Sequence, residues 1–201
     1  MIATQNESAR TLRQKLKRGG QCLLLVILPV VLAVGGYAGC LIAEHNLHVV
    51  EPGQVYRSSR MSPEALTKVI QANGIRSVLS LIGRNRAESD TVQRLGAEYF
   101  DVSLSDRHEV TDEQFEEIFA IIRRAPRPLL IHCKAGADRV GLVASLYRYA
   151  IEGQSAAVAD QELTIRYGHL PPCLGFGVSA MDRSFWRYVS HHAPGSAANG
   201  Q

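Results

Sequence analysis

The alternation of short apolar strands with amphipathic helices predicts an α/β fold, with a mostly parallel central sheet flanked by helices. Residues 129–132 are a short apolar run, typical of a central strand that is covered on both faces. Ahead of this domain, no charged residue occurs from Gly19 to Ala43. This segment predicts one N-terminal transmembrane helix before the domain.

The individual elements follow from their apolar periodicity and their end signals. Strands are expected at residues 55–57, 75–81, 99–104 and 129–132. Ser62 caps a helix that begins at Pro63 and ends at Gly74. Thr111 and Gln114 fit a capping box for a helix that runs to about residue 124. Further helices are expected at residues 88–95, 139–151, 155–167 and 178–189.

The N-terminal segment has the features of a signal-anchor. Residues 22–43 are apolar and would measure about 33 Å as a helix, enough to cross a bilayer. Five basic residues precede it: Arg10, Arg13, Lys15, Lys17 and Arg18. The positive-inside rule therefore places residues 1–18 in the cytoplasm and the chain after Glu44 outside it.

These features divide the chain into four parts. We expect a basic cytoplasmic N-terminus at 1–18, a transmembrane signal-anchor at 19–43, a folded domain at 44–190 and a disordered tail at 191–201. Two alternatives for the apolar segment stay open. One is a cleaved signal peptide, whose apolar region is usually only about 7–15 residues. The other is lipidation at Cys40.

The charges of the folded part argue against a nucleic-acid partner. Beyond the anchor, the remaining 17 basic and 18 acidic residues nearly cancel. A folded part with almost no net charge has little electrostatic attraction to a polyanion.

The folded part contains only two cysteines, Cys133 and Cys173, so it has no disulfide framework.

The segment from Cys133 to Arg139 has the composition of an oxyanion site between a strand and a helix. Its small residues Ala135, Gly136 and Ala137 let the backbone curl so that successive N–H groups point into one concavity. The helix that follows adds the positive end of its dipole, and Arg139 offers a planar fork to two phosphate oxygens. These donors favour the thiolate form of Cys133, a nucleophile that attacks phosphorus.

A leaving alkoxide or phenoxide needs a proton, and Asp106 is the preferred donor. It follows the expected strand 99–104 and therefore lies at the same carboxyl edge of the sheet as Cys133. Asp101 falls inside that strand and is assigned a structural role. Glu109 and Asp112 are weaker candidates for the proton donor. Asp112 belongs to a helix start.

The sequence His132-Cys133-x-x-Gly136-x-x-Arg139 resembles the signature of the protein tyrosine phosphatase superfamily, in its dual-specificity branch. The resemblance extends to residues 55–58, 73–81 and 166–169 and covers about residues 48–190. The chain resembles small bacterial phosphatases of this kind, some of which are secreted to the periplasm with an N-terminal apolar segment. The resemblance implies a phosphatase domain at 44–190 that sits in the periplasm, on a single-pass inner-membrane anchor.

The same resemblance implies the roles of individual residues. Cys133 is the nucleophile, Arg139 binds phosphate and Asp106 is the general acid. The substrate's phosphate is bound by the loop residues Lys134, Ala135, Gly136, Ala137, Asp138 and Arg139. No metal and no organic cofactor are implied. The expected partners are a phosphorylated protein or lipid and, through residues 19–43, the membrane.

One position departs from the family pattern. Val140 stands where the family usually has Ser or Thr, whose hydroxyl helps the cysteine leave when water hydrolyses the phospho-enzyme.

Three functions stay open, the last of them because of Val140. The first is a protein phosphatase acting on phosphotyrosine, phosphoserine or phosphothreonine. The second is a phosphatase for phospholipids or other small phosphomonoesters, and the third is a phosphate-binding module with little turnover.

Overall fold

The computed structural model describes residues 25, 27–170 and 179–192. The chain divides into two units, one ending at Cys40 and one beginning at Leu41. In the first unit the described residues are helical and expose apolar side chains such as Leu28, Val31 and Val34. Among the described residues, no helix is both long and apolar enough to span a membrane. The expected anchor at 19–43 starts outside the described residues, and it stays a prediction.

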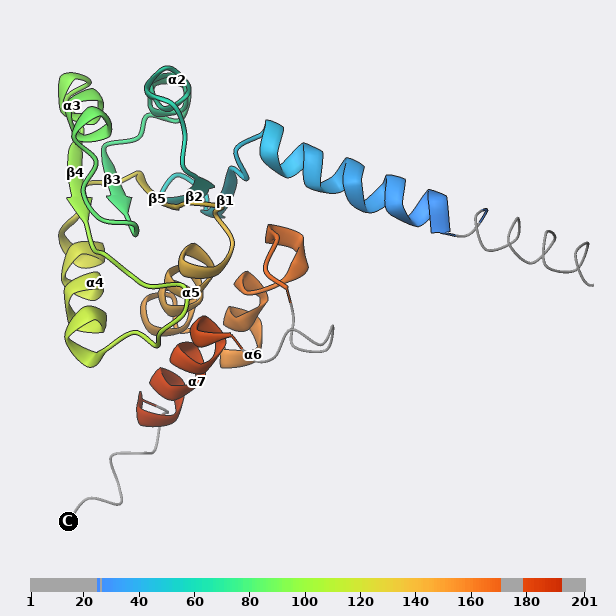
Figure 1. The fold of residues 1–201 in the computed structure, drawn as a ribbon. Helices are drawn as coiled ribbons and strands as arrows, with labels where there is room; N and C mark the ends of the chain where they lie inside the picture. The colour runs from blue at the N-terminus through green and yellow to red at the C-terminus, as the bar shows by residue number, and fades with distance from the viewer. Residues whose placement is uncertain (1–24, 26, 171–178, 193–201) are drawn as a thin grey trace, which may run out of the picture. The chain divides into compact units, whose positions relative to one another are not determined.

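The second unit is built on a five-stranded sheet in the order β1-β2-β5-β3-β4 (Figure 1). Its strands are β1 (His48–Glu51), β2 (Val55–Ser59), β3 (Ser77–Ser80), β4 (Glu98–Asp101) and β5 (Leu129–Cys133). All neighbours are parallel except β1 and β2, which confirms the expected α/β fold with a mostly parallel sheet. Strand β5 is central, and all five of its residues are buried.

Helices cover both faces of the sheet (Figure 1). On one face, α2 (Pro63–Asn73) and α3 (Arg86–Arg94) pack against Leu130 of β5 and Val78 of β3. On the other, α4 (Asp112–Arg124), α5 (Asp138–Leu146) and α7 (Ala180–His192) enclose the larger apolar core, which includes Ile131 and Cys133. Successive residues of β5 thus face opposite layers, so His132 points away from the layer that Cys133 faces.

The predicted ends of two helices, α2 and α4, are confirmed. Ser62 Oγ accepts a hydrogen bond from the Ala65 N–H at 3.3 Å, and Gly74 closes α2 in the left-handed region at φ +60°. Thr111 and Gln114 form the predicted capping box at the start of α4. These local signals therefore set the bounds of α2 and α4.

Several boundaries differ from expectation. Residues 155–167 form no continuous helix but α6 (Ala156–Ala159) and two 3-10 turns, Asp160–Glu162 and Ile165–Tyr167. The expected helix 139–151 is α5 followed by a π-helical turn, Tyr147–Ile151. Helix α7 extends through His192, two residues into the expected tail, and residues 193–201 lie outside the described part. Strand β1 was not predicted.

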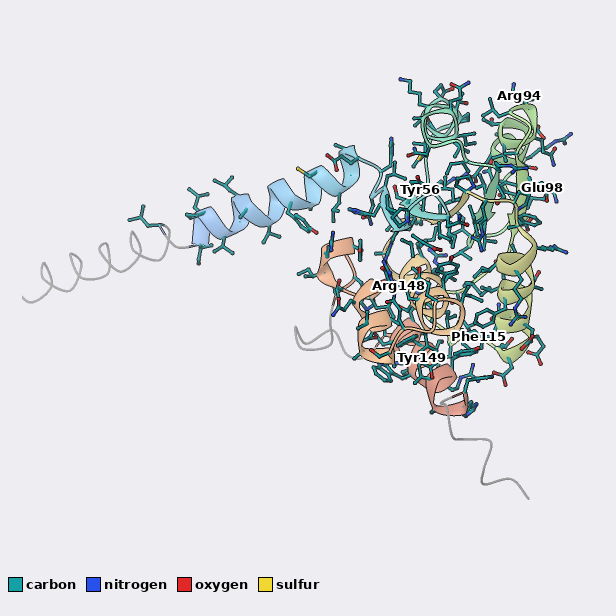
Figure 2. The ribbon with its side chains drawn as sticks, turned by 180° about the vertical axis from the view of Figure 1, so that it is seen from behind. Tyr56, Arg94, Glu98, Phe115, Arg148 and Tyr149 are labelled. Atoms are coloured by element: carbon teal, nitrogen blue, oxygen red, sulfur yellow. The ribbon has the colours of Figure 1, made fainter. Side chains whose placement is uncertain are left out.

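An aromatic cluster joins α7 to the rest of the helical layer. The ring of Tyr188 on α7 lies 5.3 Å from that of Phe115 on α4 and 6.4 Å from that of Tyr149 in the π-helical turn. Figure 2 shows Phe115 and Tyr149 in this layer, on the face of the sheet where β5 delivers Cys133. The C-terminal helix is therefore fixed against the same layer that carries the candidate site.

Candidate active site

The predicted phosphate-binding loop joins the end of β5 to the start of α5, at the carboxyl edge of the sheet where α/β proteins bind ligands. Cys133 is the last residue of β5 and is 2% exposed. Its Sγ accepts a hydrogen bond from the Gly136 N–H at 3.3 Å. The loop therefore curls back toward the sulfur.

Gly136 is required by the close approach of this loop to β2. Its φ is +73°, in the left-handed region, and a Cβ there would lie 2.7 Å from the Ser58 carbonyl carbon and from the Ser59 nitrogen. Both atoms belong to backbone and cannot rotate aside. Only glycine fits, so the backbone of β2 and the tip of the loop are in direct contact.

The buried side chain of Arg57, on β2, holds the loop from behind. Its Nη2 donates to the carbonyl oxygens of Gly136 at 2.8 Å and Ala137 at 3.2 Å. Its Nη1 donates to the backbone carbonyl of Glu162 at 2.9 Å and to its Oε2 at 2.7 Å. The guanidinium also lies 3.9 Å from the centre of the Tyr167 ring. Burial lowers the pKa of Arg57, and the Glu162 carboxylate opposes that shift.

Two more groups hold the remaining loop carbonyls. Asn46 Nδ2 donates to the Ala135 oxygen at 3.0 Å, and the Arg60 N–H donates to the Lys134 oxygen at 3.4 Å. Asn46 is buried and adopts a left-handed backbone at φ +47°, a conformation that Asn tolerates better than most residues. It also donates to the Tyr167 oxygen at 2.9 Å.

The N–H groups of the loop point to the side opposite its hydrogen-bonded carbonyl oxygens. All four carbonyl oxygens from Lys134 to Ala137 accept hydrogen bonds from behind the loop. In a trans peptide unit the N–H points opposite to the C=O. The loop amides therefore turn toward the side where Cys133 Sγ lies, as the Gly136 N–H does. This arrangement presents N–H donors around a nucleophile, which suits an oxyanion.

Arg139 lies in the first turn of α5, beside the loop. Its Nη1 donates to the Leu104 carbonyl at 3.2 Å, while its buried Nε has no hydrogen-bond partner among the described residues. A buried N–H without a partner is costly unless a ligand satisfies it. The contact with Leu104 also ties Arg139 to the segment that carries Asp106.

Asp106 lies in the exposed segment between β4 and α4. With Arg107, Asp138 and His169 it lines a hollow of about 320 Å³. The structure thus brings the predicted acid and one predicted loop residue to the same hollow. Asp101 ends β4, and its Oδ1 lies 3.8 Å from Nη1 of the exposed Arg84.

Other predicted positions have clear locations. Lys134 is exposed at the edge of the loop, and Ala137 is buried beneath it. Val140 is fully buried in the core beside the loop, so the first turn of α5 carries no hydroxyl at this position. Within the described ranges, no three His, Cys, Asp or Glu side chains are grouped closely enough to hold a metal ion.

Sequence reasoning missed the supporting residues. It gave no role to Arg57, although the Val-Tyr-Arg-Ser segment was part of the resemblance, and it overlooked Asn46 and Glu162. It also missed Glu88 on α3, whose Oε1 lies 2.7 Å from His132 Nε2 in the opposite layer. An arginine inside an expected strand is the one sequence signal that pointed to Arg57.

Solved structures with this fold support the architecture. Crystal structures of TpbA from P. aeruginosa in complex with pTyr, of the catalytic core of the PP-IP phosphatase Siw14 from S. cerevisiae with citrate, and of PTPMT1 with PI(5)P are similar to this chain. Identities are 24%, 21% and 12%, with TM-scores of 0.50, 0.55 and 0.57. The matches cover 62%, 72% and 72% of this chain and 76%, 91% and 95% of the solved chains.

At these identities the solved structures establish the fold alone. No curated protein sequence matches the chain significantly. A family model does match, over residues 44–169, which include the whole loop from Cys133 to Arg139. The chain therefore belongs to the PTP-SAK family, the Swiss Army Knife proteins with a DSP-PTPase phosphatase domain, and is a dual-specificity-like member of the protein tyrosine phosphatase superfamily.

Proposed function

We propose that this protein hydrolyses phosphomonoesters through a cysteinyl-phosphate intermediate. The observation that carries the proposal is the loop itself. Cys133 Sγ lies on the side to which the loop amides turn, and Arg139 presents a buried N–H without a protein partner. An oxyanion placed there would meet both the amides and the guanidinium.

Two steps account for the reaction. The Cys133 thiolate attacks phosphorus, forming a P–S bond as the P–O bond to the leaving group breaks, and Asp106 gives its proton to that oxygen. Water then attacks phosphorus, its proton returns to the Asp106 carboxylate, and the thiolate leaves as inorganic phosphate forms. Arg139 and the loop amides stabilise the charge on the transferred group in both steps.

The proposed substrate is a phosphorylated protein, with phosphotyrosine or phosphoserine and phosphothreonine side chains. The support is the fold shared with TpbA, which was solved with phosphotyrosine. PTPMT1, solved with PI(5)P, makes a phosphorylated lipid the alternative. A panel of phosphopeptides and phospholipids, with Cys133→Ser as the blank, distinguishes the two.

A second candidate function is phosphate binding with little turnover, and Val140 favours it. The usual hydroxyl at this position assists the departing thiolate, whereas Val140 is fully buried and offers only methyl groups. Without that assistance the second step is slower, and a phospho-enzyme accumulates.

We also propose that residues 19–43 anchor the protein in the inner membrane, with the phosphatase domain in the periplasm. The support is the apolar composition of the segment, the five basic residues before it and the exposed apolar side chains of its described part.

Replacing Asp106 with Asn should slow poor leaving groups far more than good ones, because only a poor leaving group needs the proton. We expect kcat/KM to fall about 10²- to 10⁴-fold for an alkyl phosphate and much less for a nitrophenyl phosphate. Glu109→Gln is the matched control, because the Glu109 carboxylate is nearby and accepts a hydrogen bond from Arg183. This variant should leave both rates unchanged. Equal losses for the two substrates would exclude Asp106 as the acid, and hydrolysis by Cys133→Ser would exclude the mechanism.

Replacing Gly136 with Ala should weaken oxyanion binding, because the new Cβ meets the β2 backbone at 2.7 Å. Gly153 has a similar φ of +69° but nothing within 4 Å of its Cβ position, so Gly153→Ala separates strain from collision. We expect the dissociation constant for tungstate to rise more than tenfold in the first variant only, as measured by calorimetry. Equal weakening in both variants would contradict the packing argument.

Replacing Val140 with Thr should accelerate the second step, since it restores the hydroxyl with little change in volume. The wild-type chain should give a burst of one product per site followed by slow turnover. In Val140→Thr the steady rate should rise about 10- to 100-fold, or about 1.4–2.8 kcal/mol. Val140→Ala, which has no hydroxyl, should not be rescued. Fast multiple turnover by the wild type would reject the low-turnover function.

The full-length chain should stay with the membrane fraction after alkaline carbonate extraction, and protease added to spheroplasts should digest its phosphatase domain. Replacing Leu28 and Val31 with Lys should release it, since each charge at the centre of a span costs about 2.5–3.5 kcal/mol. Release of the unaltered chain by carbonate would contradict the anchor, and protection from protease would contradict the orientation.

A further inference from the structure

His169 lies between two carboxylates from different elements. Its Nδ1 is 2.6 Å from Asp138 Oδ1, and its Nε2 is 3.2 Å from both oxygens of Asp182. Asp138 is the first residue of α5 and Asp182 the third of α7. His169 is 1% exposed, so each ring nitrogen faces an acceptor in a nearly dry environment. Only the protonated ring donates from both nitrogens at once.

The surroundings favour that protonated ring. Burial alone lowers the pKa of His169, but the hydrogen bonds to Asp138 and Asp182, together with their charges, outweigh burial and raise the pKa to about 9. For Asp182, burial alone would raise the pKa. Its hydrogen bonds to His169 and Ser179 outweigh burial and lower the pKa below its ordinary value. At neutral pH the three groups therefore form an ion triad.

Other charged groups near the triad come from two further elements. Asp160, in the first 3-10 turn, interacts with both Asp182 and His169. Asp106 and Arg107, from the segment after β4, line the same hollow as the buried His169 and the half-exposed Asp138. The triad therefore borders the hollow that contains the proposed acid.

The triad also borders the phosphate-binding loop. Asp138 is the residue immediately before Arg139, and Ala137, before it, has its carbonyl held by Arg57. On the other side, the backbone N–H of His169 donates to the Thr164 carbonyl at 3.1 Å. Arg57, Asn46 and Arg60 hold the loop carbonyls, but none of them contacts the Asp138 side chain. His169 provides that contact.

We propose that His169 is a positioning residue of the catalytic loop: it holds Asp138 to Asp182 and so fixes the first turn of α5, and with it Arg139, in the orientation that binds the substrate's phosphate. This role rests on the proposed phosphatase function. The clamp depends on the ring proton. Because the pKa lies above its ordinary value of 6.5, the stabilisation is fully present below about pH 6.5 and is lost as pH rises through about 9.

The test measures kcat/KM for an aryl phosphate from pH 6 to 10 in the full-length protein and in two variants. The wild type should lose activity through about pH 9. His169→Gln, which cannot hold both carboxylates, should be about 10- to 100-fold slower at pH 7 and lack this alkaline loss. Asp182→Asn removes one stabilising charge, so it should keep the loss but shift it to lower pH.

Binding of sulfate, which stays doubly charged over this range, gives a readout that does not need turnover. Its affinity, measured by calorimetry, should follow the same pH dependence and the same shifts. If both variants lower the melting temperature but leave the pH dependence of sulfate binding unchanged, His169 is only a packing residue and the proposal is overturned. If aryl phosphate is not hydrolysed by the wild type, the proposed function fails, while the sulfate series still tests His169. If His169→Gln does not fold, the shift in Asp182→Asn decides.

Discussion

The conformation of the phosphate-binding loop depends on one buried cation, the guanidinium of Arg57. It has no exposed surface, and a buried charge is expensive unless it is paired and hydrogen-bonded. Both terminal nitrogens of Arg57 donate to protein oxygens, whereas its Nε has no partner among the described residues. Glu162 supplies the opposite charge, and its second oxygen accepts from Arg148 Nε at 2.6 Å. Loss of one partner from such a buried pair typically costs about 3–5 kcal/mol, so replacing Arg57 or Glu162 alone leaves an uncompensated buried charge.

An apolar residue of similar volume cannot replace Arg57, although buried ion pairs in general often tolerate such replacement. The reason is the loop. Gly136 would keep a buried carbonyl oxygen without a donor, which costs about 1–3 kcal/mol, and the Ala137 oxygen would keep only the Gly141 N–H at 2.8 Å, so the Gly136 peptide unit would be free to rotate. The amides would then no longer turn toward Cys133. The broken helical segment 160–167 follows from the same requirement, because it brings Glu162 and Tyr167 to the guanidinium.

The sequence was sufficient where the signal is local. Helix ends at Ser62, Gly74 and Thr111 are determined by side chains within a few residues, and the turn of the Cys133–Arg139 loop is determined by a short contiguous segment with Gly136 at its tip. The sequence did not predict contacts between residues that lie far apart along the chain. Asn46 reaches Ala135 across 89 positions and Arg57 reaches Glu162 across 105, and no periodicity encodes such pairings. The break after α6 was missed for the same reason, since a helix pattern does not reveal that Glu162 must turn inward.

The position of Asn46 changes where the folded domain begins. A domain starting at residue 44 would omit Leu41, whose carbonyl accepts from the Asn46 N–H at 2.7 Å, and Ile42, whose carbonyl accepts from His45 at 3.2 Å. That turn sets the left-handed backbone from which Asn46 reaches the loop, and the compact unit accordingly begins at Leu41. A soluble fragment cut at Glu44 would therefore keep every residue of the signature motif and still lose part of its support. For expression and crystallisation, the boundary belongs at or before residue 41.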